Sequence, residues 1–179
     1  RRTRKNGEEG SRQNYSRTYI RTQDKKYFTT TMLKLVIGSG PGYQHQDDVI
    51  ALDYIAVFNP DVVRDIKRGL PFDSEKFDVV EAFHILEHIE SNADFLFVMN
   101  EVHRVLKSRG IFRITVPHHL SSSAIDVYEH CRLFNENSFV NFYSNPYAKE
   151  MGIELYEFIE KGVRDKDGGQ EVFVTIGKL

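Results

Sequence analysis

A glycine-rich segment followed closely by an acidic residue is the strongest chemical signal in the sequence. An apolar run at residues 32–37 leads into Gly-Ser-Gly-Pro-Gly at 38–42, and a second apolar run at 49–52 ends at Asp53. Glycines let a backbone approach a ligand closely, and an acid at the tip of the next strand can accept hydrogen bonds from ribose hydroxyls. The pattern is typical of a nucleoside-binding site in an α/β fold.

The spacing within this segment restricts the ligand. Asp53 comes only eleven residues after Gly42, whereas a dinucleotide-binding fingerprint places its acid about 20 residues on, with a helix in between. Residues 43–48 are too few to hold such a helix. We therefore expect the first crossover helix to be shortened or absent, and the ligand to need no phosphate-binding helix.

Composition limits the class of protein. A length of 179 residues predicts one domain with a real core, and 40% hydrophobic with 28% charged residues indicates a soluble globular chain. No apolar run is long enough to span a membrane, and no leader resembles a signal peptide. The single cysteine, Cys131, cannot form an internal disulfide, which favours the cytoplasm. We expect its thiol to be buried and unreactive.

The charge is unevenly distributed along the chain. Residues 1–30 carry a net charge of +6 and the remainder −8. Residues 1–31 lack apolar periodicity and are rich in polar residues, which predicts a disordered or non-native basic arm before a single domain at 32–179. A basic arm can also bind nucleic acid, but the composition favours the first interpretation.

Strand and helix signals alternate after Asp53, as expected of a parallel sheet with crossover connections. A strand is expected at 77–83, a helix at 92–107 from its three- and four-residue apolar spacing, and a strand at 111–116. Asn135 is expected to cap a short helix that runs through Tyr143.

The end of the chain has a different pattern. Residues 153–160 and 171–176 alternate between apolar and polar residues and are separated by a glycine turn at 167–169. This predicts a hairpin that adds an antiparallel strand to an otherwise parallel sheet.

The order of these motifs resembles that of the class I S-adenosylmethionine-dependent methyltransferases, especially the small type 11 group. Each matching piece is weak alone, but the ordered set, which covers roughly residues 33–140, is fairly specific. The matching residues are Ile37 to Gly42, Asp53, Asp65, Leu70-Pro71-Phe72, Phe77-Asp78-Val79-Val80, Leu86-Glu87-His88 and Arg104 to Gly110. The resemblance implies a Rossmann-like, doubly wound, mostly parallel sheet that ends in an antiparallel hairpin.

The resemblance also implies S-adenosylmethionine as the cofactor. This cofactor has no pyrophosphate, which explains the missing helix. The glycine loop would contact its methionine part, Asp53 its ribose and Asp65 its adenine. The residues assigned to cofactor binding are Gly38, Ser39, Gly40, Gly42, Asp53, Tyr54, Asp65, Ile66, Leu70, Phe83 and His84. One departure is Val36, which stands where many members have an acid for the cofactor's ammonium group.

Methyl transfer needs the acceptor held in line with the methyl group, and a hydroxyl or amine acceptor can also need a base. Histidine suits this role near pH 7. His118 follows the strand at 111–116, and His130 lies in the loop expected to close over the pocket. We therefore expect these two residues to be the catalytic bases.

A competing motif directly follows the strand expected at 77–83. The residues from His84 to His88 match H-x-x-E-H, an inverted zinc-protease pattern that requires both histidines on one helix. Because the segment follows a strand, zinc binding is disfavoured and no metal site is expected.

The sequence thus predicts a cytoplasmic methyltransferase acting on a small-molecule acceptor. The alternatives are a non-catalytic interaction or cofactor-binding module, then an NAD(P)-dependent oxidoreductase. Neither a membrane nor nucleic acid is favoured as a partner. A homo-oligomer remains open, because a partner subunit could cover the sheet face that the missing helix exposes.

Overall fold

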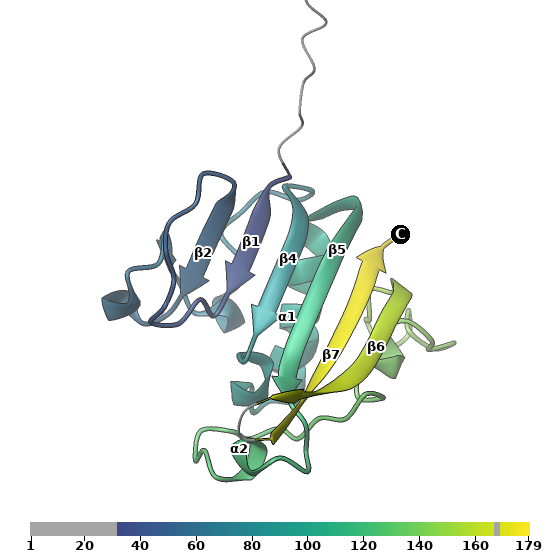
Figure 1. Ribbon diagram of the computed structural model, residues 1–179. Coiled ribbons are helices and arrows are strands. Elements are labelled where there is room, and N and C mark those ends of the chain that lie inside the picture. Colours follow the sequence, from purple (N-terminus) through teal and green to yellow (C-terminus); the bar gives the residue numbers. More distant parts are fainter. Residues whose placement is uncertain (1–31, 167–168) are drawn as a thin grey trace, which may run out of the picture. The chain divides into compact units, whose positions relative to one another are not determined.

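The computed structural model describes residues 32–166 and 169–179 (Figure 1). The basic arm expected at 1–31 and two residues of the expected turn at 167–169 lie outside the described residues.

A seven-stranded sheet forms the centre of this part of the chain, in the strand order β3-β2-β1-β4-β5-β7-β6. Neighbouring strands from β3 to β5 pair in parallel, and β7 pairs antiparallel with both β5 and β6. The Rossmann-like, mostly parallel sheet with a terminal antiparallel hairpin is therefore confirmed. The bounds are β1 Lys34–Ile37, β2 Val49–Asp53, β3 Val62–Val63, β4 Phe77–Phe83, β5 Leu106–Pro117, β6 Tyr156–Lys166 and β7 Gly169–Lys178.

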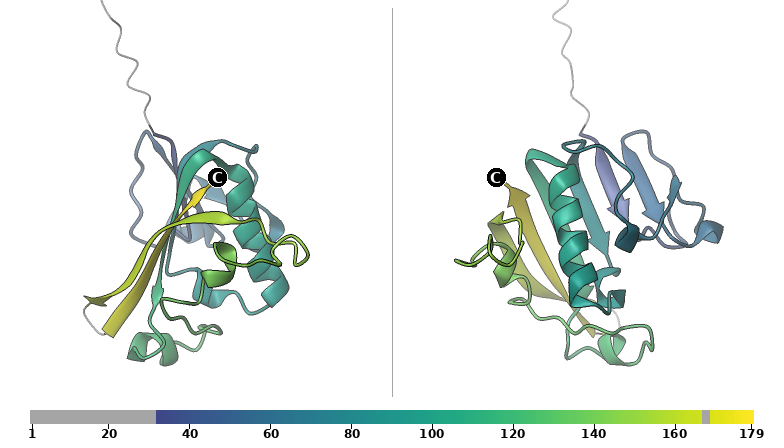
Figure 2. Two further views of the ribbon diagram at one scale, coloured as in Figure 1. Left: turned by 90° about the vertical axis from the view of Figure 1, so that its right-hand side faces the viewer. Right: turned by 180° about the vertical axis from the view of Figure 1, so that it is seen from behind.

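One long helix, α1 (Asn92–Val105), lies against one face of the sheet (Figure 2). Ser91 caps it by accepting a hydrogen bond from the Asp94 N–H, and the helix ends where β5 begins at Leu106. The other helices are short: η1 Ala56–Phe58, η2 Ile66–Arg68, η3 Leu86–His88, α2 Ser122–Ile125 and η4 Val140–Phe142. None of the helices in the described ranges has the length and apolar character needed to cross a membrane.

The core lies between α1 and the sheet. Alternate residues of β1, β4 and β5 are buried against the apolar side of the helix, as the two-residue period of a strand requires: Leu35, Ile37, Val80, Ala82, Phe112, Ile114 and Val116. On the intervening positions Glu81 forms ion pairs with Lys34 at 3.3 Å and Arg113 at 3.1 Å. The sheet therefore has one apolar face and one face with charged side chains.

The connection from β1 to β2 contains a turn but no helix at residues 38–48, which confirms the expected loss of the first crossover helix. The first and second strands are consequently joined by a loop alone (Figure 1). The carboxyl ends of the parallel strands lie at one edge of the sheet, where a ligand of an open α/β sheet is expected to bind.

The helix expected after Asn135 is wrong. Only the 3-10 helix η4 forms in this segment, preceded by turns. Asn135 Oδ1 accepts the Asn137 N–H at 2.8 Å, and Ser138 Oγ accepts the Asn135 N–H at 2.9 Å. Such local side-chain bonds compete with helical ones. Phe139 stacks on Phe134 within the core, which holds the irregular path in place.

Candidate functional site

Loops at the carboxyl edge of β1, β2 and β4 enclose a cavity of about 220 Å³, which continues into a wider groove of about 760 Å³. The two spaces share several wall residues, so they form one continuous site. Of the residues expected to bind a cofactor, those that line it are Gly38, Gly40, Asp53, Tyr54, Asp65, Ile66 and His84.

Gly38 is the tightest position of the glycine loop. Its φ of +71° lies in the left-handed region, and a Cβ on this residue would lie 2.7 Å from the Ile85 Cβ. A side chain therefore fits neither the backbone conformation nor the space. Gly40 also has a positive φ, of +66°, but faces open space. Gly42 is exposed at a turn and is not brought to the cavity.

Asp53 fixes the shape of the loops around it. The residue is 5% exposed, its Oδ2 accepts the Gly40 N–H at 3.0 Å, and its Oδ1 accepts the Ile55 N–H at 2.9 Å. A carboxylate oxygen can accept more than one hydrogen bond, so this pairing leaves acceptor capacity toward the cavity. Asp53 thus joins the glycine loop to the end of β2 while forming part of the wall.

Asp65 and Ile66 form the opposite wall. Asp65 Oδ1 accepts the Lys67 N–H at 3.0 Å and caps η2, which presents the buried Ile66 beside the cavity. Leu70, expected to flank a base, is instead a core residue that is 4% exposed and does not line the cavity.

The loop beyond η2 is held by α1. Glu101 accepts the Leu70 N–H at 2.8 Å, while the Arg104 guanidinium donates to the carbonyls of Leu70 and Phe72 and to Glu101. Hydrogen bonds from Arg104 hold the pKa of Glu101 below its ordinary value, against the opposing effect of burial. This clamp fixes the wall that carries Asp65.

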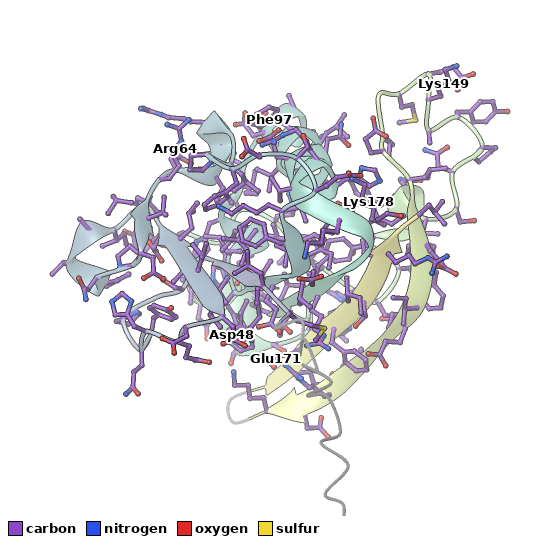
Figure 3. All side chains as sticks on the ribbon, turned by 90° about the horizontal axis from the view of Figure 1, so that it is seen from above. Asp48, Arg64, Phe97, Lys149, Glu171 and Lys178 are labelled. Atoms are coloured by element: carbon purple, nitrogen blue, oxygen red, sulfur yellow. The ribbon has the colours of Figure 1, made fainter. Side chains whose placement is uncertain are left out.

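His84 leaves β4 in a left-handed conformation, with φ of +51°. Its Nε2 lies 2.6 Å from Oε1 of Glu171, a buried residue of β7 (Figure 3), and its Nδ1 lies 3.3 Å from Glu87 Oε1. Burial lowers the pKa of His84, but the adjacent carboxylates of Glu87 and Glu171 outweigh burial and raise it. Such an imidazole, paired through both nitrogens, is poorly suited to act as a base.

Phe83 is 44% exposed, meets the His84 ring edge-on, and has its own ring under the Lys166 ammonium. It does not line the site. Lys166 and Arg164 also donate to Glu171, at 2.7 and 3.0 Å. Burial raises the pKa of Glu171, but these donors and His84 lower it overall.

The two expected bases have mostly buried side chains and do not line the site. His118 is 7% exposed, and its Nδ1 accepts the Leu120 N–H at 3.3 Å. His130 has an 8% exposed side chain, with Nε2 3.9 Å from Glu87 Oε1. Neither lines the cavity or the groove, so the structure does not bring them together with the cofactor-binding candidates.

Several residues of the wall were not predicted from the sequence, and one was misjudged. Ile85 and His88 line both the cavity and the groove, and His88 could have been found through the H-x-x-E-H segment. The expectation of a buried thiol is wrong: Cys131 is exposed at the groove, where its N–H and Sγ both contact the Glu87 carbonyl.

The chain is similar in sequence to a known domain family and in fold to solved structures. Residues 35–114 match the family model for a methyltransferase domain of the type 11 group. No match was found among curated protein sequences.

The similar structures include the N-methyltransferase NodS from Bradyrhizobium japonicum WM9 in complex with S-adenosylhomocysteine, with a TM-score of 0.59, 10% identity and coverage of 82% of this chain and 78% of NodS. The Burkholderia thailandensis 1,6-didemethyltoxoflavin-N1-methyltransferase has a TM-score of 0.55 and 16% identity, covering 82% and 71% of the two chains. The [4+2]-cyclase SpnF has a TM-score of 0.61 and 13% identity, covering 82% and 74%.

The strand order, the glycine loop that meets Asp53 and the family match agree with one another. Residues 35–114 therefore carry the match to a methyltransferase domain, within a Rossmann-like fold that the chain shares with the solved methyltransferases named above.

Proposed function

We propose that this chain transfers the methyl group of S-adenosylmethionine to a small-molecule acceptor, and that both bind in the cavity and groove at the carboxyl edge of the sheet. The observation that carries the proposal is the convergence of Gly38, Asp53 and Asp65 on one cavity. The first gives close backbone approach, and the two carboxylates can accept from the ribose and the adenine amino group.

The shape of the site supports this cofactor over a dinucleotide. No helix follows β1, so no helix N-terminus is available there for a pyrophosphate. Val36 supplies no acid for the cofactor's ammonium group, so backbone carbonyls near the glycine loop would take that role.

The groove is the proposed acceptor site. It runs from Gly40 and Tyr54 past His84 and His88 to Tyr128 and Cys131. A small molecule fits this space beside the cofactor cavity, and the similar Burkholderia thailandensis enzyme is named for a small-molecule acceptor, 1,6-didemethyltoxoflavin. The transfer would proceed by direct in-line displacement, in which the bond from methyl carbon to sulfur breaks as the bond to the acceptor forms.

His118 stays a candidate base. Its ring is held by Leu120, and its participation would require loop residues 118–134 to move toward the groove. Replacement by Ala is expected to lower turnover while S-adenosylhomocysteine binding stays intact, and unchanged turnover would remove His118 from the mechanism. A cytoplasmic location remains a prediction from the single cysteine.

A second candidate is a domain that binds the cofactor without transferring its methyl group. The loop that replaces the first crossover helix favours it, because one segment of the usual fold is missing beside the glycine loop. The similarity to a [4+2]-cyclase also means that this fold alone does not establish methyl transfer.

Calorimetric titration of the full chain with S-adenosylmethionine, S-adenosylhomocysteine and NADH tests the proposal. We expect the two sulfur nucleosides to bind and NADH not to bind. Binding of NADH alone would establish the oxidoreductase alternative, and binding of none would leave the interaction module. Release of S-adenosylhomocysteine with a panel of small acceptors then separates an enzyme from a cofactor-binding domain.

A further inference from the structure

Three side chains of types that can bind a metal ion converge beside the groove, and none of them belongs to the glycine loop. Glu87 and His88 are neighbours on η3, and His130 comes from the loop after α2. One potential ligand atom from each residue lies within 4.8 Å of those of the other two. The cluster thus joins two segments that are more than forty residues apart in the sequence.

Hydrogen bonds to backbone carbonyls of residues 87–90 hold the two segments together. The Cys131 N–H donates to the Glu87 carbonyl at 3.0 Å, and Cys131 Sγ approaches the same oxygen at 3.3 Å. Arg132 donates to the carbonyls of Ile89 and Glu90. His130 is therefore anchored next to Glu87 by its immediate neighbours in the chain.

Glu87 is a buried carboxylate that accepts no hydrogen bond in the described part of the chain. It is 1% exposed, and neither carboxylate oxygen accepts a hydrogen bond from any residue in the described ranges. His84 Nδ1 lies 3.3 Å from Oε1, within ion-pairing distance but outside hydrogen-bonding geometry. His130 Nδ1 is also buried without a partner in this part of the chain. Buried charges are normally paired and hydrogen-bonded or bound to metal, because desolvation is costly.

We propose that Glu87, His88 and His130 bind a divalent transition-metal ion, with zinc as the first candidate. A carboxylate with two imidazoles is a ligand set that zinc uses in sites that keep a fourth position open. Tetrahedral zinc holds its ligand atoms roughly 3.4 Å apart, so the three side chains would draw together by about 1 Å on binding.

This site differs from the one that the H-x-x-E-H pattern describes. The pattern pairs His84 with His88 on a helix, whereas here His84 ends a strand and His88 lies on a 3-10 turn. His84 is held by Glu171 instead, and His88 is in ring contact with His130 at 4.7 Å between centroids. His84 is therefore a positioning residue, which orients the Glu87 carboxylate from outside the ligand set.

The site's position gives the metal a use that rests on the proposed methyl transfer. His88 lines both the cavity and the groove, so the ion would lie at their shared wall. Its open coordination position would accept an oxygen of the acceptor, and a bound hydroxyl would lose its proton to the solvent of the groove more readily than a free one. The acceptor class favoured is therefore one that presents a hydroxyl or carboxylate oxygen.

The test is metal binding by the full chain after treatment with EDTA and dialysis. Titration with Zn²⁺ is expected to give one ion per chain, and Co²⁺ to give the intense visible absorption of a tetrahedral site. His88→Gln and His130→Gln should each weaken Zn²⁺ binding by at least about tenfold. His45→Gln is the matched control, because His45 is 60% exposed and pairs with Asp61 away from the cluster.

Folding and cofactor binding are measured separately. Thermal unfolding shows whether each variant is folded, and the half-exposed His88 keeps the test valid should His130→Gln fail to fold. Substoichiometric Zn²⁺ binding, or equal binding by wild type and folded His88→Gln, would overturn the metal site. A wild-type chain that binds Zn²⁺ but not S-adenosylhomocysteine would contradict the proposed function and would leave the proposed metal site supported.

Discussion

Two regions at the carboxyl edge of the sheet satisfy their buried carboxylates in opposite ways. At the cofactor end, Asp53 is 5% exposed and both of its oxygens accept backbone N–H groups of neighbouring loops. At the β4 end, Glu87 is 1% exposed and accepts no hydrogen bond from the described residues, although histidines surround it.

The difference indicates which parts of the site are complete. Asp53 and the glycine loop define each other's geometry, so this end is organised by the protein itself. The cluster around Glu87 brings a buried carboxylate and two imidazoles together, and neither Glu87 oxygen accepts a hydrogen bond from the described residues. We infer that one region receives a ligand into a preformed shape, while the other is completed by what binds there.

The largest effect on the preformed region, which consists of the glycine loop and Asp53, is expected from a substitution of Gly38. Gly38→Ala adds a methyl group 2.7 Å from Ile85 Cβ in a left-handed conformation, and we expect a loss of about 3 kcal/mol in unfolding free energy. Chemical denaturation measures this effect. Gly42→Ala is the control for folding, because a Cβ there meets nothing within 4 Å; equal losses in both variants would contradict the account of the loop.

Asp53→Asn tests the same region through its hydrogen bonds. One of the two backbone donors would face an amide NH₂ in place of an oxygen, so we expect a loss of about 2 kcal/mol in stability and weaker S-adenosylhomocysteine binding. Asp48→Asn, at an exposed residue that precedes β2, is the matched control. Calorimetry and denaturation of both variants check the prediction, which fails if Asp53→Asn behaves as Asp48→Asn does.

The clamp on the Asp65 wall gives a pH-dependent prediction. Because the pKa of Glu101 is lowered in the folded chain, its contribution is full above the unfolded value of about 4.3 and is lost as pH falls through the folded pKa. Glu101→Gln should be less stable than wild type by about 1 kcal/mol at pH 7, with the difference shrinking below pH of about 4. Urea denaturation of both proteins across this pH range tests the prediction. A stability difference that does not change with pH would exclude the ionised carboxylate as its source.

The smallest expected effect comes from two residues with a left-handed backbone, one at the site and one away from it. Arg109 has φ of +64° where the pairing of β5 with β4 shifts register, away from both regions. Arg109→Gly should stabilise the chain by about 1 kcal/mol, because glycine adopts this conformation without cost. Arg109→Ala, which keeps the unfavourable conformation, should not stabilise it. His84 also has a left-handed backbone conformation. His84→Gly should nevertheless lower the stability of the chain, because the contact of His84 with Glu171 disappears.

Much of the fold could be predicted because it follows from local pattern. The apolar spacing gave α1 to within two residues of its observed end, and the eleven-residue gap before Asp53 predicted the missing helix. The helix after Asn135 was predicted wrongly, because side-chain hydrogen bonds and the burial of Phe139 decide that segment. Neither effect is visible as a periodicity.

The site could be predicted only in part. Gly38, Asp53 and Asp65 follow strands in order, so their meeting at one edge follows from parallel topology. Leu70 and Phe83 do not line the cavity or the groove, because a position after a short helix or at a strand end does not reveal which way a side chain turns. The contact of His130 with Glu87 and His88 depends on how a long loop folds back, which no spacing encodes.

The central claim is that S-adenosylmethionine binds at the carboxyl edge of β1 and β2. The most direct test is an amide NMR titration of the isotope-labelled full chain with S-adenosylhomocysteine. The account predicts saturable shifts at Gly38, Gly40, Asp53 and Asp65, with amides on β6 unaffected. Saturation with no shifts at the glycine loop, or shifts confined to another surface, would contradict it.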